Sequence, residues 1–235
     1  VQQGKIDVNA PAPVPEWQSP GDPRAAITTD NLLRMTSGLH SDHAGNRTDA
    51  LYFGGTAVTE QAVAWPLEAA PGTRWRYANN DTLLAMRGLQ SLLKGEQKLA
   101  WPMTDLFWRI GMNRTVPETD WHGNFILSSQ VWTTARDLAR FALLYLNDGV
   151  WNGERLLPPG WGTYVSRLGP AQPDNGDGYG AGFWTFPKDS GLPADAYLGQ
   201  GNRGQYVVII PSRSLLLVRP GHDGPGTRFN LEAFT

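Results

Sequence analysis

Residues 204–221 read GQYVVIIPSRSLLLVRPG, and this stretch decides the fold that we expect. Its two runs, Tyr206–Ile210 and Leu215–Val218, are rich in β-branched and leucine side chains and are joined by a short Pro-Ser-Arg-Ser link. Two such runs on either side of a turn predict a hairpin of antiparallel strands. Because both runs are apolar on both faces, we expect the hairpin at the centre of a covered sheet.

Upstream of the hairpin, the octapeptide YGAGFWTF, residues 179–186, is a further strand candidate. Helical periodicity precedes it in four places: about residues 30–37, where Thr29 or Asp30 can cap; 80–94, where Asn80 or Asp81 can cap; about 103–110; and 134–149, where Thr134 and Asp137 have the spacing of a capping box. We therefore expect an α+β fold in one domain spanning residues 1–235. A mostly helical region covers about 24–165, and an antiparallel sheet flanked by helices covers about 166–235.

The segment PAPVPEWQSPGDP, residues 11–23, has five prolines. Proline fixes φ and lacks a backbone donor, so the segment is expected to lie extended over the surface as a connector.

The composition limits the class of partner. Twenty Lys and Arg against 22 Asp and Glu give a net charge of −2, so no basic field favours nucleic acid, and a small molecule is the expected ligand. The absence of cysteine excludes disulfides and thiolate catalysis but leaves the compartment open. No apolar run approaches the roughly 20 residues that span a bilayer.

The stretch PGTRWRYANNDT, residues 71–82, leads into the second helical segment and carries Tyr77 and Asn79. Side chains on such a turn are held by a rigid element and still point into open space, which favours a functional site. The alternative from local sequence alone is a packing tyrosine followed by an Asn that caps the helix.

Four stretches in order resemble the serine β-lactamase and penicillin-binding-protein superfamily, most closely its esterase and 6-aminohexanoate-dimer hydrolase branch. They are ITTDNLLRMTSGL, PGTRWRYANNDTLLA, VWTTARDLARFALLYLNDG and GQGNRGQYVVIIPSRSLLLV. The resemblance implies a β-lactamase/transpeptidase-like fold and a serine hydrolase that forms an acyl-enzyme with a small ester or amide, without a cofactor or metal. It slightly favours a periplasmic or secreted location and leaves the oligomeric state open.

The resemblance also implies roles for individual residues. Tyr77-Ala78-Asn79 fits the Tyr-x-Asn motif of the family, in which Tyr77 shuttles a proton and Asn79 orients a lysine or the substrate carbonyl. A phenol with a pKa near 10 needs cationic neighbours or a lysine to act as a base at neutral pH.

A further motif of the family, Lys-Thr-Gly in β-lactamases and often His-x-Gly in the esterase branch, lies on the strand that lines the cleft. By resemblance, its place is taken here by Asn202-Arg203-Gly204-Gln205. The backbone N–H of Gln205 would donate to the oxyanion, Gly204 would allow close approach of the acyl group, and Asn202 and Arg203 would contact substrate. Asn202 is uncharged where β-lactamases have a lysine, which favours esters or amides over penicillins. Arg203 could hold a substrate carboxylate or be a solvated edge residue.

In the family the nucleophilic serine and a lysine are spaced Ser-x-x-Lys on a buried helix, and this motif has no convincing match in the sequence. The chain has one Ser-x-x-Lys, formed by Ser91 and Lys94, but it comes after Tyr77 instead of preceding it and falls on the polar face of its helix. Since VQQGKIDVNAP resembles the segment after the nucleophile helix in the family, the catalytic Ser and Lys are expected three to four helical turns upstream of Val1. We expect truncation at both ends, because RFNLEAFT resembles an interrupted C-terminal helix.

Two other interpretations stay open to test. His40 and His43 could suggest a metal, but without a convincing third ligand they are expected at the surface, and no metal is predicted. The rival function is a non-catalytic binding module or pseudoenzyme. It would use the cleft expected between the helical region and the sheet, to which Tyr77 and Asn79 contribute, for a peptide or sugar, and stacking on some of the ten tryptophans would favour it.

Overall fold

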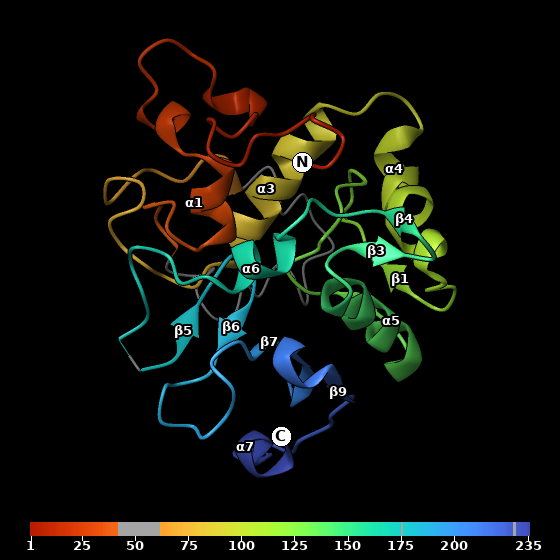
Figure 1. The fold of residues 1–235 in the computed structure, drawn as a ribbon. Coiled ribbons are helices and arrows are strands. Elements are labelled where there is room, and N and C mark those ends of the chain that lie inside the picture. The colour runs from red at the N-terminus through yellow and green to blue at the C-terminus, as the bar shows by residue number, and fades with distance from the viewer. Residues whose placement is uncertain (42–61, 175, 228) are drawn as a thin grey trace.

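The computed structural model describes residues 1–41, 62–174, 176–227 and 229–235 (Figure 1). In chain order its elements are η1 (Pro15–Trp17), η2 (Pro23–Ala26), α1 (Thr29–Leu33), α3 (Asn79–Ser91), α4 (Gln97–Pro102), η4 (Met103–Phe107), η5 (Trp108–Ile110), β1 (Val116–Pro117), β2 (Val131–Trp132), α5 (Ala135–Leu146), β3 (Val150–Trp151), β4 (Glu154–Arg155), α6 (Trp161–Ser166), β5 (Gly178–Tyr179), β6 (Trp184–Thr185), β7 (Tyr197–Gly201), β8 (Gln205–Ile210), η6 (Pro211–Arg213), β9 (Leu215–Arg219) and α7 (Leu231–Phe234). This is the α+β fold expected from the sequence, with an antiparallel sheet flanked by helices.

The main sheet has the strand order β5-β6-β7-β8-β9, and every neighbouring pair is antiparallel. The predicted hairpin is β8 and β9, joined by η6, and its register pairs Ile210 with Leu215. On one face Val207 and Ile209 pack with Ala142 of α5, and on the other Val208 and Ile210 pack beneath the C-terminal segment. Both faces are covered, as expected.

The position of the hairpin within the sheet was predicted wrongly. β8 is buried, but β9 is the last strand among the described residues and its side chains are all partly exposed. An apolar run on both faces marks burial from above and below, and it does not report whether a further strand pairs at the side.

The octapeptide YGAGFWTF was also predicted wrongly, because it forms two strands and not one. β5 and β6 are joined by a tight turn in which the Gly180 N–H donates to the Phe183 carbonyl and Gly182 has φ +81°. Glycine adopts this left-handed conformation at little cost, so the chain reverses there.

The proline-rich segment is the largest departure from the sequence prediction. Val14 and Trp17 are completely buried, and they pack with Ile27, Leu32 and Leu84 in one core cluster. The indole N–H of Trp17 donates to the Val63 carbonyl at 3.1 Å. The prolines start the 3-10 turns η1 and η2 instead of an extended surface connector, and the apolar residues among them face inward.

Helix caps agree with the sequence in one case and differ in two. α5 begins as predicted, with the Thr134 hydroxyl accepting from the Asp137 N–H. α1 is capped by Thr28, one residue earlier than expected, in a capping box with Asn31. α3 has Ala78 as its N-cap and no side-chain cap, so the predicted capping by Asn80 or Asp81 is wrong.

The helix predicted at about 103–110 is less regular than expected. An α-helical turn begins earlier, as α4, and continues through Pro102 into the π-helical η4 and the 3-10 turn η5. Proline inside a helix removes one backbone bond and displaces the preceding carbonyl, which accounts for the change of helix type.

α1 and α3 lie side by side near the N-terminus, and the C-terminus lies at the opposite end of the molecule (Figure 1). A buried polar network joins α1 to α6. Arg34, which is almost fully buried, donates to Asp30 at 2.8 Å and to the Arg167 carbonyl at 2.6 Å. The Tyr164 hydroxyl donates to Asp30 at 2.6 Å, and the pKa of Tyr164 is raised by burial and by the Asp30 carboxylate.

Tyr164→Phe is expected to lower the free energy of unfolding by about 1.5–3 kcal/mol, because it removes a hydrogen bond to a carboxylate. Denaturant unfolding measures the change. Tyr197→Phe is the matched control, since the buried Tyr197 hydroxyl has no hydrogen-bond partner in the described structure. Equal stability of the two variants would show that the Tyr164 bond adds nothing.

Candidate active site

Tyr77 and Asn79 lie where α3 begins. Ala78 is extended, with φ −146° and ψ 119°, and Asn79 is the first helical residue, so Asn79 does not act as the N-cap. Asn79 is buried, and within the described part of the chain its side chain makes no hydrogen bond. The capping role that local sequence suggested for Asn79 is therefore wrong.

The Tyr77 ring belongs to a cluster of four aromatic side chains from distant parts of the chain. It stacks on Trp184 of β6, with ring centroids 5.9 Å apart and planes at 21°, and meets Tyr179 of β5 edge-on at 6.3 Å. Trp75 contacts both of these partners, at 5.7 Å from Tyr179 and 5.8 Å from Trp184. These ring contacts fix the orientation of Tyr77. Because Tyr77 is only half-buried, part of the side chain stays accessible.

The cluster lies beside an open strand edge. β6 pairs with β7 only at Trp184↔Leu198 and Thr185↔Tyr197, whereas β8 pairs with β7 as far as Gly201. Residues 199–201 therefore have β8 on one side and no strand on the other among the residues that the structure describes. The open edge begins next to Leu198, the partner of the tryptophan on which Tyr77 stacks. Its backbone groups are able to bind an extended ligand.

The predicted residues Asn202 to Gln205 lie at the turn from β7 to β8. Gly204 has φ +76°, and a Cβ there would come within 2.3 Å of Arg219 and Asp223. Arg219 donates to the Gly204 carbonyl at 2.7 Å and pairs with Asp223 at 2.6 Å. The Gln205 side chain binds both backbone polar groups of Gly221. The turn is therefore held by the end of β9 and the loop after it.

The predicted site residues thus form two groups. Tyr77 and Asn79 are at the start of α3, and Asn202–Gln205 are at the hairpin turn, with β7 between Trp184 and Gln205. Asn202 and Arg203 are exposed, and a guanidinium nitrogen of Arg203 lies 3.4 Å from the His222 ring. Sequence reasoning missed Trp184 and the open edge at 199–201, although the aromatic YGAGFWTF and the glycines of residues 199–201 were visible signals.

Two acidic groups near Tyr77 have shifted pKa values. Burial raises the pKa of Asp81 to about 7, against the opposing hydrogen bonds from Ser37 and the charge of Arg74. The pKa of Tyr179 lies well above its ordinary value because the side chain is buried, and Tyr77 and Asp81 add to the shift. Tyr179 is therefore neutral at any physiological pH.

The Ser-x-x-Lys of α3 does not form a catalytic pair. Ser91 donates to the carbonyls of Pro13 and Gly88, and Lys94 is exposed beyond the end of α3.

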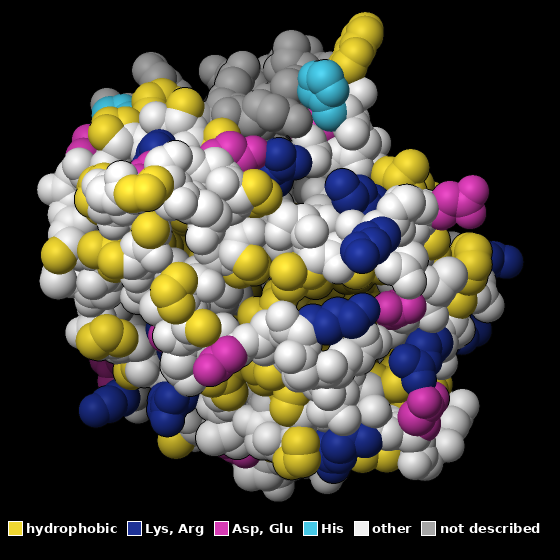
Figure 2. Space-filling model, turned by 90° about the horizontal axis from the view of Figure 1, so that it is seen from above, with side chains coloured by type: hydrophobic (Ala, Val, Ile, Leu, Met, Phe, Trp, Pro, Cys, Tyr) yellow, Lys and Arg dark blue, Asp and Glu magenta, His cyan; other side chains and the backbone are white. Residues whose placement is uncertain are grey.

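Within the described ranges no three His, Cys, Asp or Glu side chains gather as metal ligands; His43 lies outside those ranges. None of the helices described is long and apolar enough to cross a membrane. Basic and acidic side chains are interspersed on the face in Figure 2.

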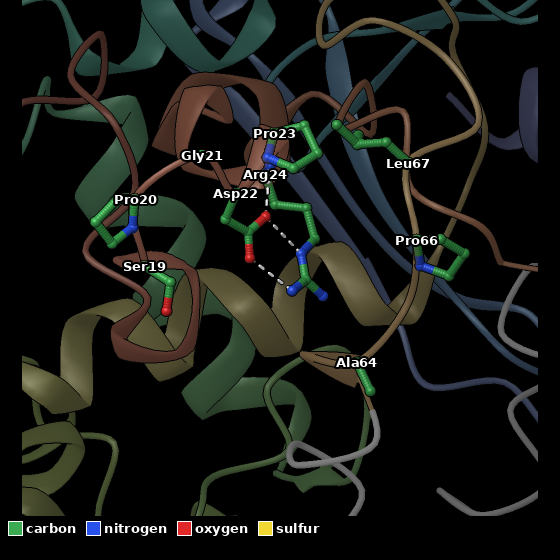
Figure 3. A pocket seen from close by; sticks show the side chains of 9 residues that line it. All are labelled: Ser19, Pro20, Gly21, Asp22, Pro23, Arg24, Ala64, Pro66 and Leu67. Atoms are coloured by element: carbon green, nitrogen blue, oxygen red, sulfur yellow. Dashed lines mark hydrogen bonds and ion pairs between the residues drawn. The ribbon is translucent and has the colours of Figure 1, made fainter.

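A hollow of about 650 Å³ lies apart from Tyr77, between the loop around Asp22 and residues 64–67 (Figure 3). Its charged groups are occupied by one another: Arg24 pairs with Asp22 at 2.7 Å and donates to the Val63 carbonyl at 2.7 Å. This hollow therefore offers a ligand no unsatisfied charged group, and the site at the start of α3 is the better candidate.

Comparisons with known proteins point to one family. The family model described as Beta-lactamase matches residues 1–219. A structure assigned as a 6-aminohexanoate-dimer hydrolase from Bacillus anthracis superimposes with a TM-score of 0.78 at 20% identity, covering 99% of this chain and 64% of that one. A family VIII carboxylesterase superimposes with a TM-score of 0.70 at 16% identity, covering 94% of this chain and 72% of that one. A penicillin-binding protein from Bacillus halodurans superimposes with a TM-score of 0.69 at 17% identity, covering 96% of this chain and 76% of that one. No curated protein sequence matches.

Proposed function

Because the chain belongs to the beta-lactamase family, a family of hydrolases, we propose that the intact protein is a serine hydrolase that forms an acyl-enzyme with a small ester or amide. The observation that carries the proposal is the half-buried Tyr77 phenol, stacked on Trp184 beside the open edge of β7. A phenol fixed next to a strand edge that pairs with no further strand among the described residues would combine a proton carrier with oxyanion donors, and acyl transfer uses both.

Each predicted residue keeps a role in this proposal. Tyr77 shuttles the proton, and Asn79, whose amide is not used for capping, orients the substrate carbonyl or the catalytic lysine. The Gln205 N–H is the oxyanion donor predicted from the sequence, while the backbone of residues 199–201 is the alternative, because these residues lie on the open edge. Asn202 and Arg203 contact substrate, and Gly204 allows close approach of the acyl group.

The test is covalent labelling of the full-length protein. A fluorophosphonate probe reacts with an activated serine, so we expect one adduct, located by mass spectrometry on a single serine other than Ser91. Hydrolysis of p-nitrophenyl acetate should disappear as the label is taken up. Ser91→Ala is the matched control and should label like the wild type, because Ser91 is bonded to backbone carbonyls.

The second candidate is a non-catalytic binding module, which the aromatic cluster favours because sugars and peptides stack on such rings. Absence of both labelling and hydrolysis in the full-length protein would overturn the hydrolase proposal in favour of this one.

A further inference from the structure

Asp81, in the first turn of α3, is a buried carboxyl that the proposed reaction does not use. It is 2% exposed, and its side chain turns away from solvent toward the loop after α1. The Ser37 hydroxyl donates to Asp81 at 2.7 Å, and the Ser37 N–H makes a longer contact of 3.4 Å. Ser37 is itself buried. Such a group is costly to bury, so its position calls for a role.

The Ser37 loop also binds the segment that leads into Tyr77. The Arg76 N–H donates to the Met35 carbonyl at 2.9 Å, and the Gly72 N–H donates to the Thr36 carbonyl at 2.8 Å. One loop therefore holds the chain before Tyr77 by backbone bonds and the chain after it through Asp81. On the C-terminal side of Tyr77, the side chain of Asp81 links the start of α3 to this loop through its hydrogen bonds with Ser37.

The surroundings of Asp81 come from three elements. Ser37 faces it from the loop, Arg74 faces it from the segment before α3, and Tyr179 faces it from β5. The Arg74 guanidinium donates to Glu68 and to the Leu39 carbonyl and makes no hydrogen bond with Asp81. Tyr179 contacts the Tyr77 ring edge-on, so a charge at Asp81 acts on one member of the aromatic cluster.

We propose that Asp81 is a positioning residue: its carboxyl anchors the first turn of α3 to Ser37 and thereby holds the Tyr77 ring against Trp184. This rests on the proposed function, in which Tyr77 carries the proton. A reacting group that moves by about 1 Å can lose on the order of 100-fold in rate, so a small shift of this turn is enough to matter.

The first experiment compares Asp81→Ala with Asp81→Asn in the full-length protein. The rate of ester hydrolysis is divided by the fraction of molecules that fluorophosphonate labels, which removes any effect of misfolded protein. Asp81→Ala should lose about 10- to 100-fold in kcat per labelled serine, with KM changing far less. Asp81→Asn still accepts from the Ser37 hydroxyl and should restore most of the rate. Equal rates per labelled serine for Asp81→Ala and the wild type would overturn the proposal.

The second experiment uses pH. Folding raises the pKa of Asp81 to about 7, so between pH about 4 and about 7 the folded protein keeps a proton that the unfolded chain releases. Asp81 therefore lowers stability as pH rises through that window, and Asp81→Asn should lack this part of the slope. Across the same transition, ionised Asp81 places a negative charge that acts on Tyr179, the edge-on partner of the Tyr77 ring, so the kcat ratio of wild type to Asp81→Asn should fall. A ratio independent of pH would contradict the role.

Asp137→Asn is the matched control, because Asp137 is also a buried carboxyl in a first helical turn and lies in α5, against the sheet. It should change stability without altering the pH dependence of kcat. The results distinguish failure of the hydrolase proposal from failure of the role proposed for Asp81. If the wild type neither labels nor hydrolyses, the hydrolase proposal falls and takes this one with it. If the wild type labels and turns over but Asp81→Ala matches it, only the role of Asp81 is lost.

Discussion

Tyr77→Phe in the full-length protein is expected to lower kcat at least about 100-fold, which corresponds to about 2.7 kcal/mol in the activation free energy. The phenylalanine ring can keep the stacking on Trp184 at 5.9 Å and the edge contact with Tyr179, so only the hydroxyl is lost. General acid–base catalysis contributes about 100- to 10,000-fold, which sets the lower limit of the effect. Steady-state hydrolysis of p-nitrophenyl acetate gives kcat.

Tyr197→Phe is the matched control for this variant. Tyr197 is buried on β7 with a hydroxyl that has no hydrogen-bond partner among the described residues, so its loss should leave turnover and stability nearly unchanged. Near-normal turnover by Tyr77→Phe would remove Tyr77 from the reaction. A loss of turnover together with a matching loss of folded protein would instead assign Tyr77 to packing, which circular dichroism and unfolding curves distinguish.

The parts of the fold that the sequence predicted correctly are those specified by neighbouring residues. The β8–β9 hairpin can be predicted from two apolar runs around a short link, and the start of α5 from the Thr134–Asp137 spacing. Both signals act within one turn of chain, where local propensity and tertiary packing agree.

The parts that failed depend on distant residues. Trp17 is buried because Val63 and Leu84 close over it, and nothing local to the proline-rich segment indicates this. The same limit applied to the site. The turn with Tyr77 was visible in the sequence, but its contact with Trp184, more than 100 residues later, depends on the pairing of β6 with β7. The catalytic roles of the predicted residues stay predictions until the variants are measured.

Trp17→Ala is expected to lower the free energy of unfolding by about 3–5 kcal/mol, the usual cost of truncating a large buried aromatic side chain. Trp17 is completely buried among Val14, Ile27 and Leu32. The substitution leaves a cavity and also leaves the Val63 carbonyl without the indole donor. Because whole domains are stable by only about 5–15 kcal/mol, denaturant unfolding will show a large shift of the midpoint.

Trp121→Ala is the control that isolates burial from residue type. Trp121 is 82% exposed, so the same substitution there should change stability by no more than about 0.5 kcal/mol. A mild effect at Trp17, similar to that at Trp121, would mean that residues 11–23 lie on the surface as their prolines suggested. A large effect at Trp17 alone would establish that the segment is part of the core packed against α1 and α3, and so supports the helix that begins two residues after Tyr77.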